Sequence, residues 1–202
     1  ISGTSPSDGF STTDTGTLIL SNANTYNGPT NILGGVLGLS NSGNLGNTSG
    51  IFFSGGTFQS TTTLTLNEPI TFVSGAGGGS FNVSSGNTLT LSGIIAGANT
   101  ADPLNTTGAG TLVLLGINTY SGPTNVTGGS LNIADSSNLG NSSEVMLSHA
   151  TLQLASDINF HASTGVSLSG TGGTIDTNGY HSTIFGVISG GAGSALTKIN
   201  GG

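Results

Sequence analysis

The sequence predicts an all-β protein folded as a parallel, right-handed β-helix of about 8 to 10 coils stacked about 4.8 Å apart. Three observations favour this fold. Short apolar segments alternate with Gly, Asn and Ser, only 4% of the residues are charged, and a stretch near the N-terminus recurs later in the chain. Strong helix formers are scarce, and no segment keeps apolar residues at helical spacing over several turns.

The expected strands are brief and alternate between aliphatic and polar residues. In chain order the clearest of them span residues 17–20, 36–39, 64–66, 81–83 and 89–91. Glycine pairs precede strands at 34–35, 55–56 and 78–79. We interpret the step from one pair to the next as one coil, in which Gly and Asn form the corners. A sandwich of two antiparallel sheets is the alternative fold, because Asn-Gly dipeptides also form hairpin turns.

A long internal repeat divides the chain. A shift of 94 residues places 16–49 on 110–143 with twenty identities in thirty-four positions. We therefore expect one continuous elongated domain made of a first unit at 1–94, a second at 95–187, and the start of a third at 188–202. Four coils per unit, or five, fit this length.

The best-kept stretch of the repeat reads NTYNGPTNILGG at 24–35 and NTYSGPTNVTGG at 118–129. We interpret each copy as a corner, a short strand and another corner. Gly28 and Gly122 are expected to take positive φ, and the proline after each fixes its own φ. The two copies should lie four or five coils apart and mark the register of each unit. The residues assigned to this structural motif are Asn24, Thr25, Tyr26, Gly28, Pro29, Gly34, Gly35, Asn118, Thr119, Tyr120, Gly122, Pro123, Gly128 and Gly129.

The charge balance argues against several classes of partner. Lys198 is the one cation beside eight carboxylates, which gives a formal net charge of −7. Binding to nucleic acid is driven by the release of counterions when Lys and Arg side chains neutralise phosphates, and this chain has almost no such side chains. No apolar run approaches the roughly 20 residues of a membrane-spanning helix. The absence of Cys excludes disulfides and thiolate chemistry.

Few residues are candidates for chemistry, and we expect no enzyme, no cofactor and no metal site. Asp157 and Asp176 are separated by close to one coil, so they could form a carboxylate pair of the kind glycosidases use. A lyase would also need a basic group, and the chain has no Arg. His161 and His181 are likewise about one coil apart and could share a metal ion. Exposed carboxylates and imidazoles are the simpler interpretation of all four.

A threonine-rich run, TTTLTL at 61–66, could be one rung of an ice-binding threonine ladder. Such a ladder needs hydroxyls at regular spacing on a flat face. The second copy has SDINF at 156–160, near the corresponding place. We therefore expect that the ladder does not persist.

The stretches GTLILSNANTYNGPTNILGGVLGL and GTLVLLGINTYSGPTNVTGGSLNI resemble the passenger-associated transport repeat, also called the autotransporter-associated β-strand repeat. The shared core is Gly-Thr-Leu-x-Leu, then Asn-Thr-Tyr-x-Gly-x-Thr, then Gly-Gly-x-Leu. It covers about a quarter of each unit. The resemblance implies a β-helical passenger of bacterial type V secretion, located on the outer surface or released, with no catalytic residues to carry over.

These expectations lead to a structural segment of a large surface-exposed or secreted passenger, which forms a rigid stalk or fibre. Its partners would be neighbouring repeats of the same parent chain, with lateral self-association favoured by the low charge. An adhesin that binds glycans through exposed Tyr26, Tyr120 or Tyr180 is the alternative. A β-helix enzyme that degrades polysaccharides, acting through Asp157 and Asp176, is a third possibility.

Overall fold

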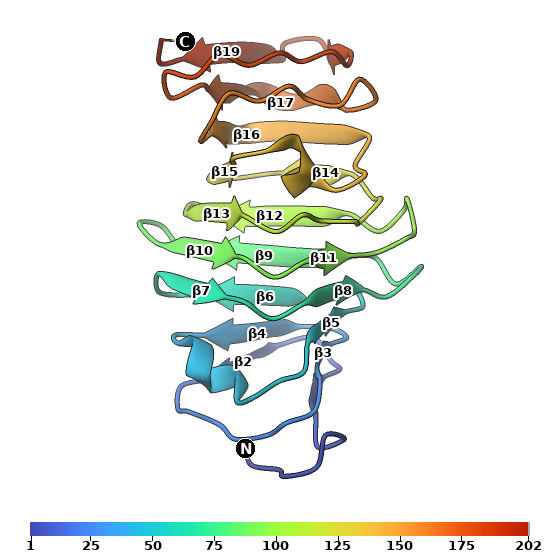
Figure 1. Ribbon diagram of the computed structural model, residues 1–202. Coiled ribbons are helices and arrows are strands. Elements are labelled where there is room, and N and C mark those ends of the chain that lie inside the picture. The colour runs from blue at the N-terminus through green and yellow to red at the C-terminus, as the bar shows by residue number, and fades with distance from the viewer. Residues whose placement is uncertain (202) are drawn as a thin grey trace.

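The computed structural model describes residues 1–201 and is a single stack of about nine coils that rises from the N-terminus to the C-terminus (Figure 1). Every pairing between named strands is parallel, and each strand pairs with a strand one coil away. The parallel solenoid is thus confirmed, and the antiparallel sandwich is wrong. The right-handed winding stays a prediction. Gly202, the last residue of the expected third unit, lies outside the described residues.

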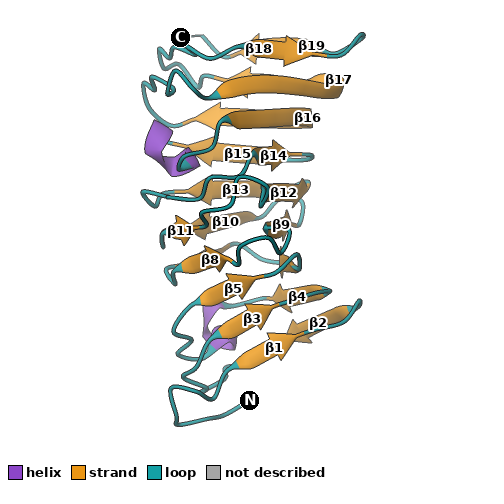
Figure 2. Cartoon of the chain, turned by 90° about the vertical axis from the view of Figure 1, so that its right-hand side faces the viewer, coloured by secondary structure: helices purple, strands orange, loops and turns teal. Residues whose placement is uncertain are grey.

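In the lower half of the stack the strands form three columns, which we call faces 1, 2 and 3. Face 1 is a five-stranded sheet (Figure 2) of β1 (Phe10–Thr12), β3 (Thr30–Ile32), β5 (Ile51–Phe53), β8 (Ile70–Phe72) and β11 (Ile95–Ala96). Face 2 consists of β2 (Thr17–Leu20), β4 (Val36–Leu39), β6 (Thr57–Ser60) and β9 (Gly79–Val83). Face 3 includes β7 (Leu64–Leu66) and β10 (Thr88–Leu91).

The upper half continues faces 2 and 3 with strands of similar length and then with two much longer ones. On face 2, β12 (Leu104–Gly108) pairs with β9 and is followed by β14 (Thr124–Val126). On face 3, β13 (Thr111–Leu114) pairs with β10 and is followed by β15 (Ser130–Ile133). Above them, β16 (Glu144–Leu154) and β17 (Gly165–Asp176) each cross both faces, bending between Ser148 and Ala150 in β16, where His149 has a φ of 54°. This bend joins faces 2 and 3 into one 14-stranded sheet, topped by β18 (Ile188–Gly190) and β19 (Ala195–Ile199).

The two copies of the repeat lie on different faces. Strands β1 and β3 of face 1 correspond, after the 94-residue shift, to β12 and β14 of face 2. Strands β2 and β4 of face 2 correspond in the same way to β13 and β15 of face 3. The 94-residue repeat therefore winds four coils and one third of another, which is why neither four nor five fits it.

The same change of face occurs again near the C-terminus. There β19 pairs with the second half of β17, just as β12 pairs with β9 one repeat earlier. Coil length varies, from a short coil between Thr17 and Val36 to a long one between Ser80 and Asn105, and the corners absorb the difference. In a longer array of such repeats, equivalent positions would return to the same face after three repeats, or about 13 coils and roughly 60 Å.

The core is a continuous column of inward side chains. Leu37, Phe58 and Phe81 occupy one inward position on three successive strands of face 2 and are fully buried. The rings of Phe53 and Phe81 lie 5.2 Å apart, so faces 1 and 2 meet through aromatic contacts. Glycine leaves room for these rings, because a Cβ on Gly79 would lie 2.6 Å from Phe72.

The helical content is very small. Two 3₁₀ helices, η1 (Ser42–Leu45) and η2 (Ser136–Leu139), occupy equivalent corners of the two copies. Among residues 1–201 no helix has the length and apolar character needed to cross a membrane.

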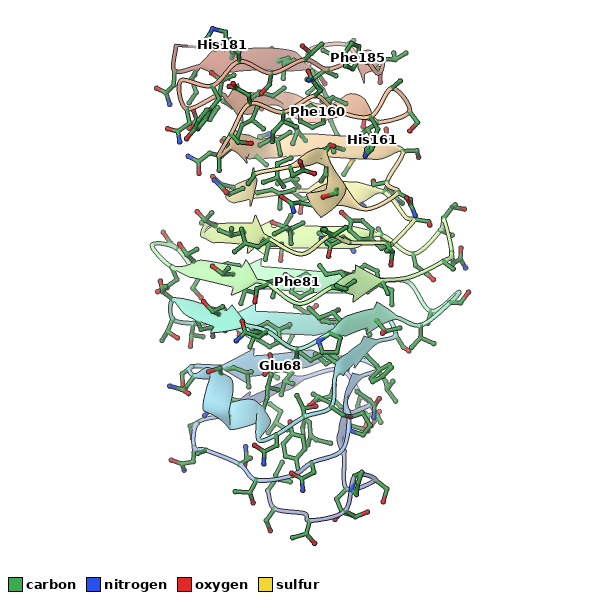
Figure 3. All side chains as sticks on the ribbon, viewed as in Figure 1. Glu68, Phe81, Phe160, His161, His181 and Phe185 are labelled. Carbon is green, nitrogen blue, oxygen red and sulfur yellow. The ribbon has the colours of Figure 1, made fainter. Side chains whose placement is uncertain are left out.

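Among the described residues, Glu68 differs from the other inward polar side chains because one of its oxygens has no partner (Figure 3). Its Oε2 atom is buried and has no hydrogen-bond partner among the described residues. Thr164 lies at the matching corner of the second copy. A Cβ on Gly93 would overlap the Glu68 carbonyl, and a Cβ on Gly186 would overlap the Thr164 carbonyl in the same way. The Thr164 hydroxyl donates to the Ser142 carbonyl at 2.9 Å, so this polar group is satisfied.

We expect Glu68→Thr to raise the free energy of unfolding by about 1 kcal/mol, because it replaces an unpaired buried oxygen with a hydroxyl that has a partner. Urea denaturation of both proteins measures the change. Glu144→Thr, at an exposed carboxylate, is the matched control and should leave stability unchanged. A loss of stability in Glu68→Thr would contradict the assignment of Glu68 as a destabilising group.

Candidate functional site: the repeated motif

The motif keeps the alternation of a strand all the way round a corner. From Leu112 to Val126 every second residue is buried, including Gly116, Asn118, Tyr120, Gly122 and Thr124. The intervening residues point outwards and are more exposed. Of the nine positions that both copies of the phrase share, the buried ones in the second copy are therefore Asn118, Tyr120, Gly122 and Thr124. The sequence interpretation of a corner, a strand and a corner is correct for β3 and β14, which start directly after Pro29 and Pro123.

The two tyrosines are fully buried, which overturns their proposed role as exposed ligand contacts. Tyr26 and Tyr120 each have 0% exposure. The Tyr120 hydroxyl pairs with Thr124 Oγ1 at 2.8 Å, and the Tyr26 hydroxyl pairs with Thr30 Oγ1 at 2.7 Å. Burial raises the pKa of both phenols above the usual value, so both stay neutral. The motif needs Tyr because its ring fills the core while its hydroxyl satisfies the threonine four residues later.

The asparagine of the motif joins three coils. Asn118 Oδ1 accepts from the Ile95 amide below at 2.8 Å, and its Nδ2 donates to the Asn138 carbonyl above at 2.6 Å. Asn24 makes the same upward bond to the Asn44 carbonyl at 2.6 Å. Beside it, the backbone amide of Thr119 donates to the Ile95 carbonyl at 2.9 Å, as that of Thr25 does to Ile1 at 3.0 Å. These groups hold register where the chain turns and strand pairing stops.

Gly28 and Gly122 do not take positive φ, and this part of the sequence interpretation is wrong. Both are buried, inward positions pressed against the coil below. A Cβ on Gly28 would lie 2.6 Å from the Gly9 nitrogen, and one on Gly122 would overlap the Asp102 carbonyl oxygen. Positive φ occurs instead at the second glycine of each pair, 61° at Gly35 and 58° at Gly129. Close approach alone thus accounts for Gly28 and Gly122, whereas Gly35 and Gly129 combine close approach with positive φ.

Each tyrosine is covered by the 3₁₀ helix of the next coil. A Cβ on Gly140, the residue that ends η2, would lie 2.7 Å from the Tyr120 carbonyl oxygen, and Gly46 after η1 has the same relation to Tyr26. The helices are capped alike, by Asn41 Oδ1 at η1 and by Asp135 Oδ1 at η2. The stretch Asn-Leu-Gly-Asn, shared by both copies, thereby closes the coil above the motif.

The two caps differ in charge, which predicts a pH effect confined to the second copy. Hydrogen bonds from Ser137 hold the pKa of Asp135 below its usual value of 3.8. A lowered folded-state pKa contributes stability that is present above the unfolded value and lost as pH falls through the folded one. Asp135→Asn should therefore lose less stability than the wild-type protein between about pH 4.5 and pH 2.

Denaturation midpoints of both proteins across this pH range measure the difference. Asp176, whose pKa is also lowered by hydrogen bonds, first of all from Asn200, is present in both proteins and cancels in the comparison. Asn41→Asp is the reciprocal variant and should gain pH dependence. Parallel pH profiles for wild type and Asp135→Asn would contradict the role of this cap.

The proposed carboxylate pair is not brought together. Asp176 aligns with Gln153 on β16, whereas Asp157 lies four residues further along that coil and accepts from the His181 amide at 2.8 Å. Asp176 is held by Gln153, Asn178 and Asn200. No arrangement of a general acid facing a nucleophile results from these positions.

The histidines are also separate. Asn159 bridges to Thr183, so His161 aligns with residues beyond His181, and the two rings lie at opposite sides of the view in Figure 3. Within residues 1–201 no group of three or more His, Asp or Glu side chains could hold a metal ion.

The threonine run at 61–66 begins a row that ends as expected, but a neighbouring row was not foreseen. Thr65 aligns with Thr90 on face 3, and Thr90 then aligns with Val113, so this row stops. Two positions earlier on the strands, Thr88 aligns with Thr111, and the row runs on through Ser130, Thr151, Thr174 and Thr197. A hydroxyl thus occupies this second position on six successive rungs. The change of face brings these residues together. On face 3, the strand that pairs with β10 from above is β13, the counterpart of β2, and not 156–160, the counterpart of the threonine run.

Comparison with known proteins agrees with the motif. The passenger-associated-transport-repeat family matches residues 12–39 and 104–133, which span both phrases. A curated relative, the adhesin BmaC autotransporter of Brucella suis biovar 1 (strain 1330), is 36% identical over 120 residues. That alignment covers 58% of this chain but 3% of the relative, so the chain corresponds to a small part of that protein. No solved structure matches the chain.

The family match and the autotransporter relative together locate the chain at the bacterial outer surface or outside the cell. The matched family is a structural passenger repeat and not a family of enzymes. Its two matched segments end with β4 on face 2 and with β15 on face 3, in keeping with the change of face between copies. Residues 12–39 and 104–133 are therefore two matches to the passenger-associated-transport-repeat family, one in each copy of the internal repeat.

Proposed function

We propose that this chain is a stalk segment of a larger autotransporter passenger, and that it works by rigidity and length. The observation that carries the proposal is the unbroken strand pairing across the boundary between copies, where β12 pairs with β9 over five residues. A hinge between units would need a boundary with few contacts. Here the boundary has the same parallel ladder and the same buried core as the units themselves.

The surfaces at the two ends support continuation of the stack. Ile188 on the last coil is 49% exposed although it aligns with the buried Val166, and Leu18 on the first coil is 44% exposed although it aligns with the buried Leu37. Phe185, labelled in Figure 3, adds a side chain that is 62% exposed on the last coil. Further repeats of the same parent chain would cover such surfaces, with units divided as 1–94, 95–187 and 188–202. Exposed apolar residues and unpaired strands of this kind otherwise promote association of chains.

Inserting a second copy of residues 95–187, the second unit, directly after residue 187 tests the stalk, because Ile188 pairs with Val166 as Ile95 pairs with Ile70. The particle should lengthen by four and one third coils, or roughly 21 Å, without a new flexible joint. Small-angle scattering measures both the length and the cross-section. A compact particle, or two bodies with variable separation, would contradict the proposal.

Lateral association is the second part of the proposal, and a patch at the boundary favours it. Ile117 is 72% exposed, Leu115 51% and Ile94 52%, and the two segments run side by side because the Thr119 amide bonds to the Ile95 carbonyl. Low charge leaves little repulsion between chains. Leu115→Ser with Ile117→Ser should reduce association in a concentration series of scattering profiles. A monomeric wild-type profile at high concentration would count against this part.

An adhesin remains the second candidate, because the relative named above is called an adhesin. Tyr180, 38% exposed, is the one tyrosine still accessible for this role. Binding to host glycans that is lost in Tyr180→Ala would support it, and a silent glycan array with folded protein would remove it.

A further inference from the structure

One row of hydroxyls on face 3 is regular and unused. Thr88, Thr111, Ser130, Thr151, Thr174 and Thr197 align on successive strands, and alternation directs them outwards, because Leu112, Leu131, Leu152 and Ile175 beside them are buried. We call these six residues the hydroxyl row. Their spacing is that of parallel strands, about 4.8 Å. Within residues 1–201 none of the six hydroxyls bonds to another protein group, so all six are available to a ligand.

The upper part of the hydroxyl row lies in a groove. Thr151, Thr174 and Thr197 line a hollow of about 250 Å³ together with His149, Thr171 and the backbone of Gly172 and Gly173. The wall of this groove is the bend at which β16 and β17 pass from face 2 to face 3. His149 holds a φ of 54° there, an uncommon conformation for a residue other than glycine. Because the groove is concave, it can contact an extended polymer on more than one side, which a flat surface cannot do.

The polar side chains of the adjacent row on face 3 bond to one another and not to the hydroxyl row. Two residues further along the strands, Asn132 Nδ2 donates to Gln153 Oε1 at 2.8 Å, and Gln153 Nε2 donates to Asp176 Oδ2 at 3.1 Å. This second row is bonded within itself. The hydroxyl row beside it therefore supplies the free donors and acceptors.

The groove contains no Lys, Arg, Asp or Glu among its lining residues. Neither an anionic nor a cationic ligand would find a counter-charge there. An uncharged ligand that pairs with evenly spaced protein hydroxyls must itself present hydrogen-bonding groups at even spacing. An extended neutral polysaccharide has this chemistry, because each pyranose ring advances the chain by a similar distance and offers several hydroxyls.

We propose that the hydroxyl row and its groove bind an extended neutral polysaccharide along face 3. The site is independent of the stalk role, since a stalk can be rigid with or without it. Recognition rests on neutral hydrogen bonds, so a single groove binds weakly, and a polymer long enough to follow the row binds more tightly than a short oligosaccharide.

Affinity electrophoresis in gels containing galactomannan, xyloglucan or dextran tests the proposal, with alginate and hyaluronan as acidic polymers and cellohexaose as the short competitor. The wild-type protein should be retarded by at least one neutral polymer and by neither acidic one. Thr151→Val with Thr174→Val removes two hydroxyls at nearly constant shape and should weaken binding about tenfold, the loss expected for two neutral hydrogen bonds. Thr151→Ser with Thr174→Ser retains the hydroxyls and should bind like the wild-type protein.

Thr57→Val with Thr71→Val is the matched control, because both threonines are outward strand residues on faces 2 and 1. It should bind like the wild-type protein, which separates the groove from a general effect of surface threonines. Retardation by no neutral polymer, equal retardation of the valine variant, or retardation by the acidic polymers alone would each overturn the proposal. Ice-recrystallisation inhibition without polysaccharide binding would also overturn it and would assign the row to ordered water.

Discussion

Tyr120→Ala should lower the free energy of unfolding by about 3 to 5 kcal/mol, the range seen when a buried aromatic residue is truncated. Tyr120 is fully buried, and its ring lies 6.0 Å from that of Phe72 in an edge-to-face arrangement. Truncation would leave a cavity between two coils and would also leave the Thr124 hydroxyl without its partner at 2.8 Å. The backbone around the cavity cannot easily collapse, because strand pairing fixes the height of each coil.

Two further variants divide this loss into its parts. Tyr120→Phe keeps the ring and removes the hydroxyl, so it should cost about 1 kcal/mol. Tyr180→Ala, at a tyrosine 38% exposed, is the matched control and should change stability by less than about 0.5 kcal/mol. Guanidinium denaturation followed by circular dichroism measures all three. Similar small losses for Tyr120→Ala and Tyr180→Ala would mean that the motif tyrosine does not support the core.

Much of the fold could be predicted from local pattern. The alternation of residues predicts strands at 17–20, 36–39 and 64–66, which are the bounds that β2, β4 and β7 have. The steps between the glycine pairs match the pairing of Val36 with Thr57 and of Thr57 with Ser80. These features depend only on alternation and on the residues that corners tolerate, and both are visible in a short window of sequence.

The extra third of a coil in each repeat, which moves the second copy to another face, could not be predicted in this way. It depends on the summed lengths of all the corners in a repeat, and the number of residues in each corner varies with no local signal. The coil from Thr57 to Ser80 is longer than the coil from Thr17 to Val36, although similar short strands begin and end both. The hydroxyl row was missed for the same reason, since its successive members are not related by the 94-residue shift.

The motif shows a different limit of sequence reasoning. The alternation from Leu112 to Gly122 already indicates that Tyr120 shares the side of Leu112 and Leu114, and this signal places the ring inside. The polar neighbours of the tyrosine favour an exposed position instead, and they mislead here. The roles of Asn118 and Asn138 were not accessible at all, because their hydrogen bonds join different coils.

Gly122→Ala should be among the most destabilising single-methyl changes in the chain, with an expected loss of about 3 kcal/mol or more. Gly122 is buried, and a Cβ there would overlap the carbonyl oxygen of Asp102 on the coil below. That backbone cannot retreat freely, because the Asp102 carboxylate accepts from the amides of Gly75 at 2.7 Å and Gly77 at 2.9 Å. The added methyl would therefore have to lift Tyr120 and Thr124 away from the coil beneath.

Two controls distinguish close approach from backbone conformation as the reason for glycine. Gly86 has a φ of 75° with open space around it, so Gly86→Asn should cost little, since Asn tolerates this conformation. Gly191 has neither positive φ nor a near neighbour, and Gly191→Ala should be neutral. If Gly122 served only to relax the backbone, Gly122→Ala would be as mild as Gly191→Ala, because its φ also lies outside the left-handed region. A large loss at Gly122 alone would show that the motif glycine sets the distance between coils, and that the repeated phrase is kept for the fit of one coil on the next.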